Sequence, residues 1–413
     1  MEGGIGQFDA IYNVLILVVV ISLIARQMNF PSTIAFIFAG IIATALPRLQ
    51  LPEISPAIFL VLLLPPILFN ETLTLDIEGL IDDSDTILSY AVVGTVLMLL
   101  AVGLYAYFIL GLSLTEAFML GIIIAPTDPV SVIATFKQLG VIKRFQLVVA
   151  GESLFNDGVA IVIYSILLIA VEVGAISGIE IFQISAVKVF GGILVGYIAG
   201  YIVHLIFCWT DDLFVEILLS FIAAFGVFRL AEEFQASGVI ATVITGLILN
   251  YRCRTIGGLS SQGEESLEVI WEFVGLLASS FAFIFIGVSL EVGLLRAYLL
   301  PILGLSLFSV VFRFVMVDII ARFLEKYRRK RIPENWRIGM TWSGLRGAVS
   351  VVLVLSLTGL GLPNIDNLLA LTYGIVLGTN VVQGLSMPWV VNRLRLFTSR
   401  PLFNQKRVEQ TAQ

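Results

Sequence analysis

Charged residues are scarce in this chain of 413 residues, and Asp, Glu, Lys and Arg together make up only 13% of it. A soluble domain carries roughly 25% charged residues, so the composition excludes an ordinary soluble protein. Hydrophobic residues make up 58% of the chain. Apolar runs of about twenty residues, enough to cross a hydrocarbon core of about 30 Å, recur along its whole length. We therefore expect an all-α polytopic membrane protein.

Cysteine and histidine are almost absent. The two cysteines, Cys208 and Cys253, provide no disulfide framework, and the single histidine, His204, cannot build a catalytic triad or a histidine metal cluster. We find no nucleophile paired with a base, no nucleotide-binding loop and no basic patch with interleaved aromatic residues. The sequence therefore gives no support to an enzyme, a cofactor-dependent protein or a nucleic-acid-binding protein.

Thirteen apolar segments are predicted to form about 13 transmembrane helices, some of them broken inside the protein. They cover approximately 8–26, 31–46, 55–73, 86–111, 114–137, 143–171, 181–208, 213–231, 237–251, 267–290, 296–324, 334–358 and 367–392. Lys and Arg prefer cytoplasmic connections. With the N-terminus outside, the outer connections hold only Arg48, Arg229 and Arg296. We therefore expect an outside N-terminus and a cytoplasmic C-terminus.

The connection after the third segment differs from the other cytoplasmic connections because it is acidic. Either it is a solvated loop, or its charge forms a vestibule that attracts cations. Its acidic residues are Glu71, Asp76, Glu78, Asp82, Asp83 and Asp85.

Two of the predicted helices are interrupted near their midpoints. Pro126 and Pro129 break the fifth segment, because each proline removes a backbone donor and disfavours helix in the preceding residue. Gly344 and Gly347 weaken the twelfth segment. The interruptions are seven helices apart, which matches two inverted six-helix repeats joined by the seventh helix. Such a pair of interrupted helices is typical of the binding site of an inverted-repeat transporter.

A charged residue lies in each interruption: Asp128 in the fifth segment and Arg346 in the twelfth. If the two unwound stretches cross, four half-helix ends meet near the centre of the membrane. Acids stabilise N-terminal helix ends and bases stabilise C-terminal ends. Asp128 and Arg346 therefore have the signs that crossing-helix dipole compensation requires.

Spacing sorts the polar residues of the sixth segment. Ser153 and Asp157 are four residues apart and share a face. Glu152 points about 140° away from Asp157 and needs a cationic partner of its own. Arg313, in the middle of the eleventh segment, is the best candidate. We expect Glu152 and Arg313 to form a buried structural ion pair.

The remaining polar groups predict an ion-binding, proton-exchanging site. A hard monovalent cation prefers oxygen ligands, which Asp157, Asp128, Ser153 and the loosened carbonyl of Thr127 can supply. Asn156 is expected to hydrogen-bond across the crossing and hold Asp128 in place. Nearby carboxylates repel each other, so the same oxygens can bind either a proton or a cation. With access from one side at a time, this competition is sufficient for antiport.

Other transport classes stay open at this point. The half-helix N-termini of an inverted repeat could bind an anion or metabolite in a symporter, but Asp128 and Asp157 would repel an anion. A channel is not excluded. The residues do not decide between sodium and potassium, so a potassium/proton antiporter remains an alternative.

Four motifs, in this order, resemble those of the NhaP-type monovalent cation–proton antiporters, which include the eukaryotic sodium/proton exchangers. Each motif is moderately specific alone, and the ordered set is highly specific. The motifs are 126–130 (Pro-Thr-Asp-Pro-Val), 151–158 (Gly-Glu-Ser-Leu-Phe-Asn-Asp-Gly), 283–290 (Phe-Ile-Phe-Ile-Gly-Val-Ser-Leu) and 344–350 (Gly-Leu-Arg-Gly-Ala-Val-Ser).

The resemblance implies an NhaA-like antiporter fold in the cell membrane and a homodimer. It implies one-for-one, electroneutral exchange of sodium or lithium for a proton, with a role in pH homeostasis. It also implies a core subdomain that moves against a dimerisation subdomain. We expect the core at approximately 55–171 and 267–358, excluding the helices of these ranges that lie at the interface. We expect the dimerisation subdomain at 8–46, 181–251 and 367–392, and a short cytoplasmic tail at 393–413.

The resemblance also assigns roles to residues at the matching positions. It makes Asp157 the essential ion-binding acid, and it places Asn156 where electrogenic relatives carry a second acid. Asp128, Thr127 and Ser153 match the other positions of the cation site. Glu152 and Arg313 match an ion pair of the core.

Overall fold

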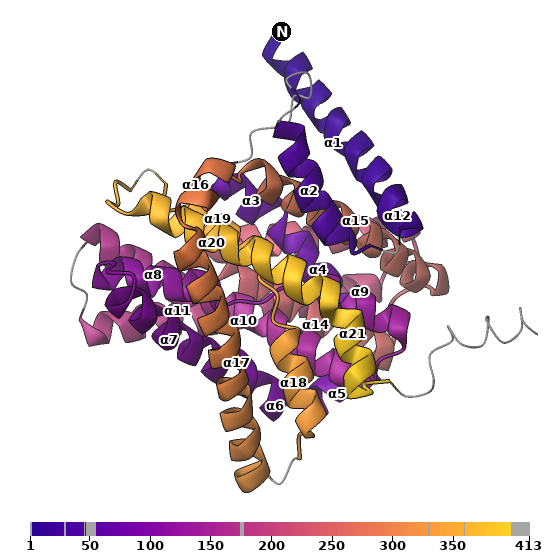
Figure 1. Cartoon of the computed structure of the whole chain (residues 1–413). Helices are drawn as coiled ribbons and strands as arrows, with labels where there is room; N and C mark the ends of the chain where they lie inside the picture. Colours follow the sequence, from indigo (N-terminus) through magenta and orange to yellow (C-terminus); the bar gives the residue numbers. More distant parts are fainter. Residues whose placement is uncertain are drawn as a thin grey trace, which may run out of the picture.

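The structure of this chain is a computed structural model that describes residues 2–28, 30–44, 46, 55–173, 177–328, 331–358 and 360–397. Every regular element in these residues is helical, as expected. Each of the thirteen predicted segments overlaps a helix or a broken helix. Figure 1 shows the resulting helical bundle, with α17 running along its height and the bent helix α20–α21 across the front.

One group of helices packs around α14 and α15. In this group α11 lies along α14, α15 lies along α2, and α4 packs against both α14 and α15. Its members are α1 (Glu2–Gln27), α2 (Ser32–Thr44), α3 (Pro56–Leu62), α4 (Leu64–Thr74), α11 (Gly178–Phe207), α12 (Leu213–Phe221), the π-helical turn η2 (Ile222–Gly226), α13 (Val227–Glu233), α14 (Gly238–Ile256) and α15 (Ser261–Val288). We call this group the outer group.

A second group contains both interrupted helices. In this group α8 packs on α7, α10 and α19, while α17 packs on α7, α18 and α20. Its members are α6 (Ser84–Leu88), η1 (Ser89–Gly94), α7 (Thr95–Phe108), α8 (Leu114–Ile124), α9 (Val130–Leu139), α10 (Lys143–Val173), α17 (Leu299–Arg328), α18 (Glu334–Trp342), α19 (Ala348–Leu355), α20 (Ile365–Thr379), η3 (Asn380–Gly384) and α21 (Leu385–Leu394). We call it the crossing group. Two short helices, α5 (Ile77–Asp82) and α16 (Val292–Ala297), lie in connections.

The two groups divide the chain differently from the predicted subdomains. Segments 55–73 and 267–290 fall inside the ranges of the predicted core, and their helices α4 and α15 make their most extensive contacts with α14 and α2. We expected 367–392 in the dimerisation subdomain, but α20 packs on α17, α19 and α8. The assignment of a moving part and a dimer contact to these groups stays a prediction.

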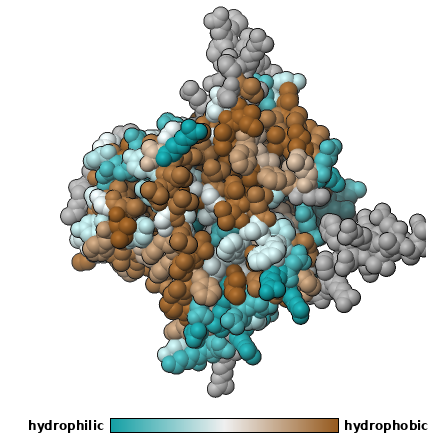
Figure 2. Space-filling view, in the orientation of Figure 1, coloured by the Kyte–Doolittle hydropathy of each residue, from teal (hydrophilic) through white to brown (hydrophobic). Residues whose placement is uncertain are grey.

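Nine helices in the described residues are long and apolar enough to cross a membrane. Three shorter apolar helices cover Ser32–Thr44, Ile58–Thr74 and Leu114–Ile124. A protein with several membrane spans is thus supported, while the number of thirteen spans stays a prediction. Figure 2 agrees with this picture, because apolar residues cover the middle of the visible face and hydrophilic residues gather near the lower ends of α17 and α18.

Local signals in the sequence set several of the helix ends. Ser113 and Glu116 form a reciprocal capping box that starts α8. Glu116 also accepts hydrogen bonds from the backbone and side chain of Asn364 (3.1 and 2.9 Å), which ties α8 to the start of α20. Gly140, with φ of 65°, ends α9 in the left-handed region that favours glycine. These ends fix the positions of the half-helices that build the site.

Candidate ion-binding site

The two interrupted helices meet through their unwound stretches. Helix α8 ends at Ile124 and α9 begins at Val130, while α18 ends at Trp342 and α19 begins at Ala348. The backbone N–H of Asp128 donates to the carbonyl of Leu345 at 2.9 Å. This hydrogen bond joins the two stretches and brings the four half-helix ends together, as the positions of the prolines and glycines predicted.

Asp128 compensates the positive N-terminal ends of two half-helices. Its Oδ1 accepts from the backbone N–H of Val130 at 3.0 Å, and its carboxylate also accepts from the backbone N–H of Ala348. These are the first residues of α9 and α19. A Cβ on Gly347 would overlap the Asp128 side chain, so the close approach requires glycine at this position.

Two arginines donate hydrogen bonds to carbonyls at the negative C-terminal ends of the half-helices α8 and α18. Arg346 Nη1 donates to the carbonyls of Ala125 and Pro126 (2.5 and 3.1 Å), directly after α8. Arg313 Nε donates to the carbonyl of Met340 in the last turn of α18, at 3.2 Å. Both arginines are buried. The structure therefore places a cation at each C-terminal half-helix end, whereas the sequence had indicated only Arg346 for this role.

Arg313 also meets the predicted partner, Glu152. Its Nη2 lies 2.8 Å from Glu152 Oε1, and the side chains are only 4% and 2% exposed. The pair links α17 to α10 inside the crossing group. A Cβ on Gly344 would overlap the Arg313 guanidinium, so this glycine makes room for the ion pair. The ion pair expected between Glu152 and Arg313 is therefore present in the structure.

Helix α10 passes the crossing without a break. Its side chains hydrogen-bond to Thr127 in the unwound stretch between α8 and α9. Ser153 Oγ donates to the Thr127 carbonyl. Asn156 Nδ2 donates to Thr127 Oγ1 at 2.9 Å, and Asn156 Oδ1 accepts from the Thr127 N–H at 3.4 Å. The expectation that Asn156 holds Asp128 is therefore wrong in detail. Asn156 holds the preceding residue, because the turn between the prolines directs Asp128 to the half-helix N-termini instead.

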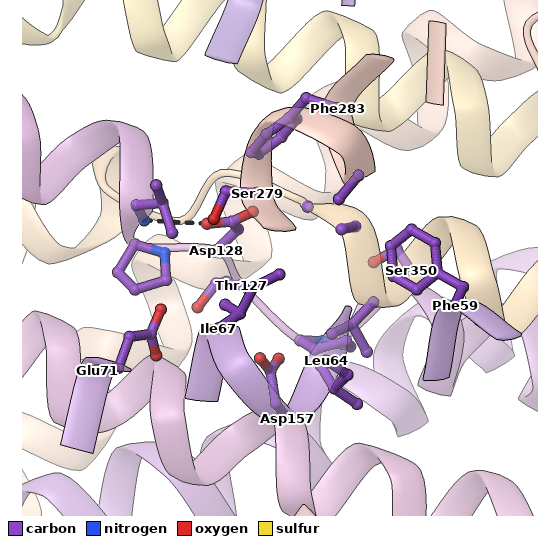
Figure 3. A pocket seen from close by; sticks show the side chains of 17 residues that line it. Phe59, Leu64, Ile67, Glu71, Thr127, Asp128, Asp157, Ser279, Phe283 and Ser350 are labelled. Carbon is purple, nitrogen blue, oxygen red and sulfur yellow. Dashed lines mark hydrogen bonds between the residues drawn. The ribbon is translucent and has the colours of Figure 1, made fainter. Parts of the chain in front are cut away.

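A small cavity lies at the crossing. Its volume is about 30 Å³, which is enough for water or a small ion. Its lining residues are Phe59, Leu64, Ile67, Glu71, Pro126, Thr127, Asp128, Pro129, Val130, Asp157, Ser279, Ala282, Phe283, Gly347, Ala348, Val349 and Ser350. Figure 3 shows the carboxylates of Glu71, Asp128 and Asp157 around this space.

The structure separates the predicted site residues into two sets. Asp157, Asp128 and Thr127 line the cavity, whereas Ser153 and Asn156 contact Thr127. Ser153 does not line the cavity, and its Oγ contacts the carbonyl of Thr127, which does. The two acids that we expected to work together do face one cavity.

Three polar residues of the cavity were not predicted from the sequence. Glu71 was grouped with the acidic connection, but it lies on α4 with Ile67 one turn away, and both line the cavity. This i, i+4 spacing was the available signal. Ser279 on α15 and Ser350 on α19 also line it, and Ser350 Oγ has no hydrogen-bond partner in the part of the chain described.

The acidic connection itself does not behave as one charged surface. Asp83 is buried and forms a bidentate pair with Arg144, at 2.6 and 2.7 Å. This pair joins the start of α10 to the connection between α5 and α6.

The charge of the cavity favours a cation. Glu71, Asp128 and Asp157 take part in no ion pair among the described residues. Uncompensated buried charge is costly, so a cation or protons must neutralise these groups. The described residues hold no cluster of three or more His, Cys, Asp and Glu that could bind a metal ion. A cation at the crossing would therefore need hydroxyl, carbonyl or water oxygens as well.

Comparisons with known proteins agree with one another. The family model described as "Sodium/hydrogen exchanger, transmembrane" matches residues 14–393. The chain is 32% identical over 412 residues to a Na⁺/H⁺ antiporter, NhaH, of Halobacillus aidingensis, an alignment that covers 96% of this chain and 100% of the relative. It is 31% identical to Na⁺/H⁺ exchanger protein 7 of Caenorhabditis elegans, over 88% of this chain and 48% of that protein.

A solved structure shares the fold. The sodium proton antiporter MjNhaP1 of Methanocaldococcus jannaschii, determined at pH 8, matches with a TM-score of 0.78. The match covers 94% of this chain and 99% of that chain, at 21% sequence identity.

Proposed function

This chain belongs to the sodium/hydrogen exchanger family, and we propose that it is a secondary transporter that exchanges sodium or lithium for protons. The observation that carries the proposal is the cavity at the crossing, where Asp157 and Asp128 face the same space. Half-helix ends, a backbone carbonyl and hydroxyl groups surround these two acids. This arrangement suits a small hard cation and repels an anion.

Competition at Asp157 would couple the two fluxes. When a cation leaves, the buried carboxylates are left uncompensated, and protons are the remaining species that can neutralise them. When a cation returns, it displaces a proton. Asp157 is the central acid in this scheme, Asp128 holds the half-helix ends in place, and the Thr127 and Ser153 oxygens complete the ligand set. The stoichiometry that we propose is one cation for one proton.

Alternating access would arise at the boundary between the two helix groups. Asp157 and Asp128 belong to the crossing group, whereas Glu71 and Ser279 reach the same cavity from the outer group. A movement of one group against the other would open the cavity to one side and then to the other side. We propose that the crossing group carries the ion past the outer group, and that the outer group forms the contact in a homodimer.

The membrane topology follows from the loop charges. We propose that the chain resides in the cell membrane with its N-terminus outside and its C-terminus in the cytoplasm. Helix α17 ends next to a cluster of ionic contacts, in which Arg337 lies 2.8 Å from Asp318 and 3.2 Å from Glu325. This cluster would then face the cytoplasm.

The test is cation-driven proton flux in proteoliposomes, followed with a pH-sensitive dye inside the vesicles. Sodium and lithium should each drive the flux, and Asp157→Asn should abolish it without loss of folded protein. Asp366→Asn, at an exposed acid in the first turn of α20, is the matched control and should keep the wild-type rate.

The outcomes separate the possible functions. Full sodium-driven flux in Asp157→Asn would overturn the assignment of this acid. Flux that only potassium can drive would make the protein a potassium/proton antiporter. Flux that requires an added anion would indicate a symporter and contradict the proposal.

A further inference from the structure

Ser279 brings a hydroxyl group to the ion cavity from the side of the outer group. It lies on α15, where Ala282 and Phe283, three and four residues further on, line the cavity with it. Residues at this spacing share one face of a helix. One face of α15 therefore forms a wall of the cavity, and Ser279 is the polar member of that wall.

The Ser279 hydroxyl is not used by the helix that carries it. A serine inside a helix can donate to the carbonyl one turn earlier. The neighbouring Ser280 does so, because its Oγ donates to the Leu276 carbonyl at 2.7 Å, and Ser280 does not line the cavity. Ser279 makes no such bond within the described part of the chain. Its oxygen is therefore available to an ion in the cavity.

The oxygens around the cavity come from both helix groups. Figure 3 shows Ser279 next to Asp128, with the Asp157 carboxylate on the other side of the space. Hard cations take oxygen ligands. Ser153, the serine that the sequence predicted for this site, contacts the Thr127 carbonyl and does not line the cavity. Ser279 supplies a serine hydroxyl to the cavity in its place.

Contacts on both sides of Ser279 fix its position. One turn before it, a Cβ on Gly275 would collide with Asn70 of α4, so α15 and α4 touch closely there. Two turns after it, a Cβ on Gly287 would overlap the Ile37 carbonyl of α2. A ligand on such a closely packed helix is in position before the ion arrives, which lowers the cost of binding.

We propose that Ser279 is a ligand of the transported cation and sets which cation the site prefers. This role rests on the exchange function proposed above. Asp157 and Asp128 belong to the crossing group, so the cation is held by oxygens of both groups at once. A serine hydroxyl can bind a cation but does not titrate near neutral pH, so it favours the cation over the proton. Sodium takes more oxygen ligands than lithium, so the added ligand favours sodium.

Sodium-driven proton flux in proteoliposomes, measured over a range of sodium concentrations, tests this role. Ser279→Ala should raise the KM for sodium about tenfold without a comparable loss of the maximal rate, because one contact to a charged group is lost. The KM for lithium should rise less, and an equal rise for both ions would refute the effect on selectivity. Ser280→Ala, one residue away, is the matched control and should keep the wild-type KM.

Competition with protons gives a second measurement. The titratable groups that line the cavity are Glu71 on α4, Asp128 between α8 and α9, and Asp157 on α10, while the lining residues of α3, α15 and α19 include none. Ser279→Ala leaves these three acids in place. A cation that binds tenfold more weakly is displaced by a tenfold lower proton concentration. At sodium concentrations well above the KM, the pH of half-maximal flux should therefore rise by about one unit.

Ser279→Cys separates a ligand from a space-filling group. A thiol occupies similar space but is a poor ligand for a hard cation, so the KM for sodium should rise again. A Ser279→Cys variant with the wild-type KM would show that the position needs only volume, and would overturn the proposal. A Ser279→Ala variant with a lower maximal rate and an unchanged KM would also overturn it, because that pattern indicates a structural role.

The two proposals fail separately. If the wild type exchanges no cation, the proposed function is lost, but calorimetry of sodium binding to the purified full chain still tests the ligand. Ser279→Ala should then bind sodium about tenfold more weakly than Ser280→Ala, and equal affinities would refute the role. If the wild type exchanges sodium and Ser279→Ala matches its KM and its pH profile, only the role of Ser279 is lost.

Discussion

The buried ion pair between Glu152 and Arg313 gives the sharpest test of how the crossing group is held together. We consider Arg313→Met, which keeps an unbranched apolar side chain but removes the charge and every donor. In the structure, Arg313 donates to Glu152 Oε1 at 2.8 Å and to the Met340 carbonyl at 3.2 Å. The substitution therefore leaves a buried carboxylate without a counter-charge and a half-helix end without its cation.

The expected effect is large for one side chain. Removing one partner of a buried ion pair destabilises a protein by about 3–5 kcal/mol. An unfolding entropy of about 2.1 cal/mol/K per residue gives about 0.9 kcal/mol/K for a chain of 413 residues. The melting temperature of Arg313→Met should therefore fall by about 3–6 °C. Thermal unfolding of the detergent-purified protein, followed by intrinsic tryptophan fluorescence at one scan rate, measures this shift.

Two companion variants separate the buried pair from charge loss in general. Arg229→Ala breaks an exposed contact with Glu233 at 3.5 Å, with side chains 69% and 59% exposed, and should lower the melting temperature by less than about 1 °C. The double variant Glu152→Leu/Arg313→Met leaves no unpaired buried charge and should be more stable than Arg313→Met alone.

The reasoning fails if Arg313→Met melts within 1 °C of the unmodified protein. It also fails if the Glu152→Leu and Arg313→Met effects simply add in the double variant. Additivity would mean that the two side chains do not interact, which their separation of 2.8 Å contradicts.

Three other outcomes follow from the crossing. Gly347→Ala should remove most exchange activity in the proteoliposome assay, because the new Cβ would overlap the Asp128 side chain, whereas Gly378→Ala has open space and should keep the activity. Arg346→Met should lower the melting temperature by about 3 °C or more, since it removes two charged hydrogen bonds to carbonyls at the end of α8. A clamped membrane potential of either sign should leave the rate of sodium-driven proton flux unchanged. A rate that follows the potential would contradict electroneutral exchange.

Much of the site was predictable because its signals are local. Prolines three residues apart cannot continue a helix, so the break in the fifth segment followed from covalent geometry. Each break contains one charged residue, Asp128 or Arg346. The helix dipole explains why charges of these signs stabilise half-helix ends. The spacing on one helix separated Glu152 from Asp157, as found, but Ser153, which the same spacing placed with Asp157, does not line the cavity.

The missed features depend on contacts between helices. Glu71 stands next to an acidic connection in the sequence, and only the packing of α4 shows that it enters the cavity. Arg313 was expected as a partner of Glu152, but its bond to the Met340 carbonyl could not be inferred, because the path of α18 was unknown. Asn156 was correctly placed at the crossing, yet the turn geometry decided that it binds Thr127.

The amino-acid sequence by itself determined that this is a helical membrane protein with two broken helices, an acid in one break, an arginine in the other and a further acid, Asp157, on the neighbouring helix. Those properties depend on hydrophobicity, on backbone chemistry and on spacing along one helix, all of which act locally. Only the tertiary structure decided which helices share a group and which carboxylates share the cavity. Each of these depends on how side chains on different helices fill the space between them, and no single segment of sequence contains that information.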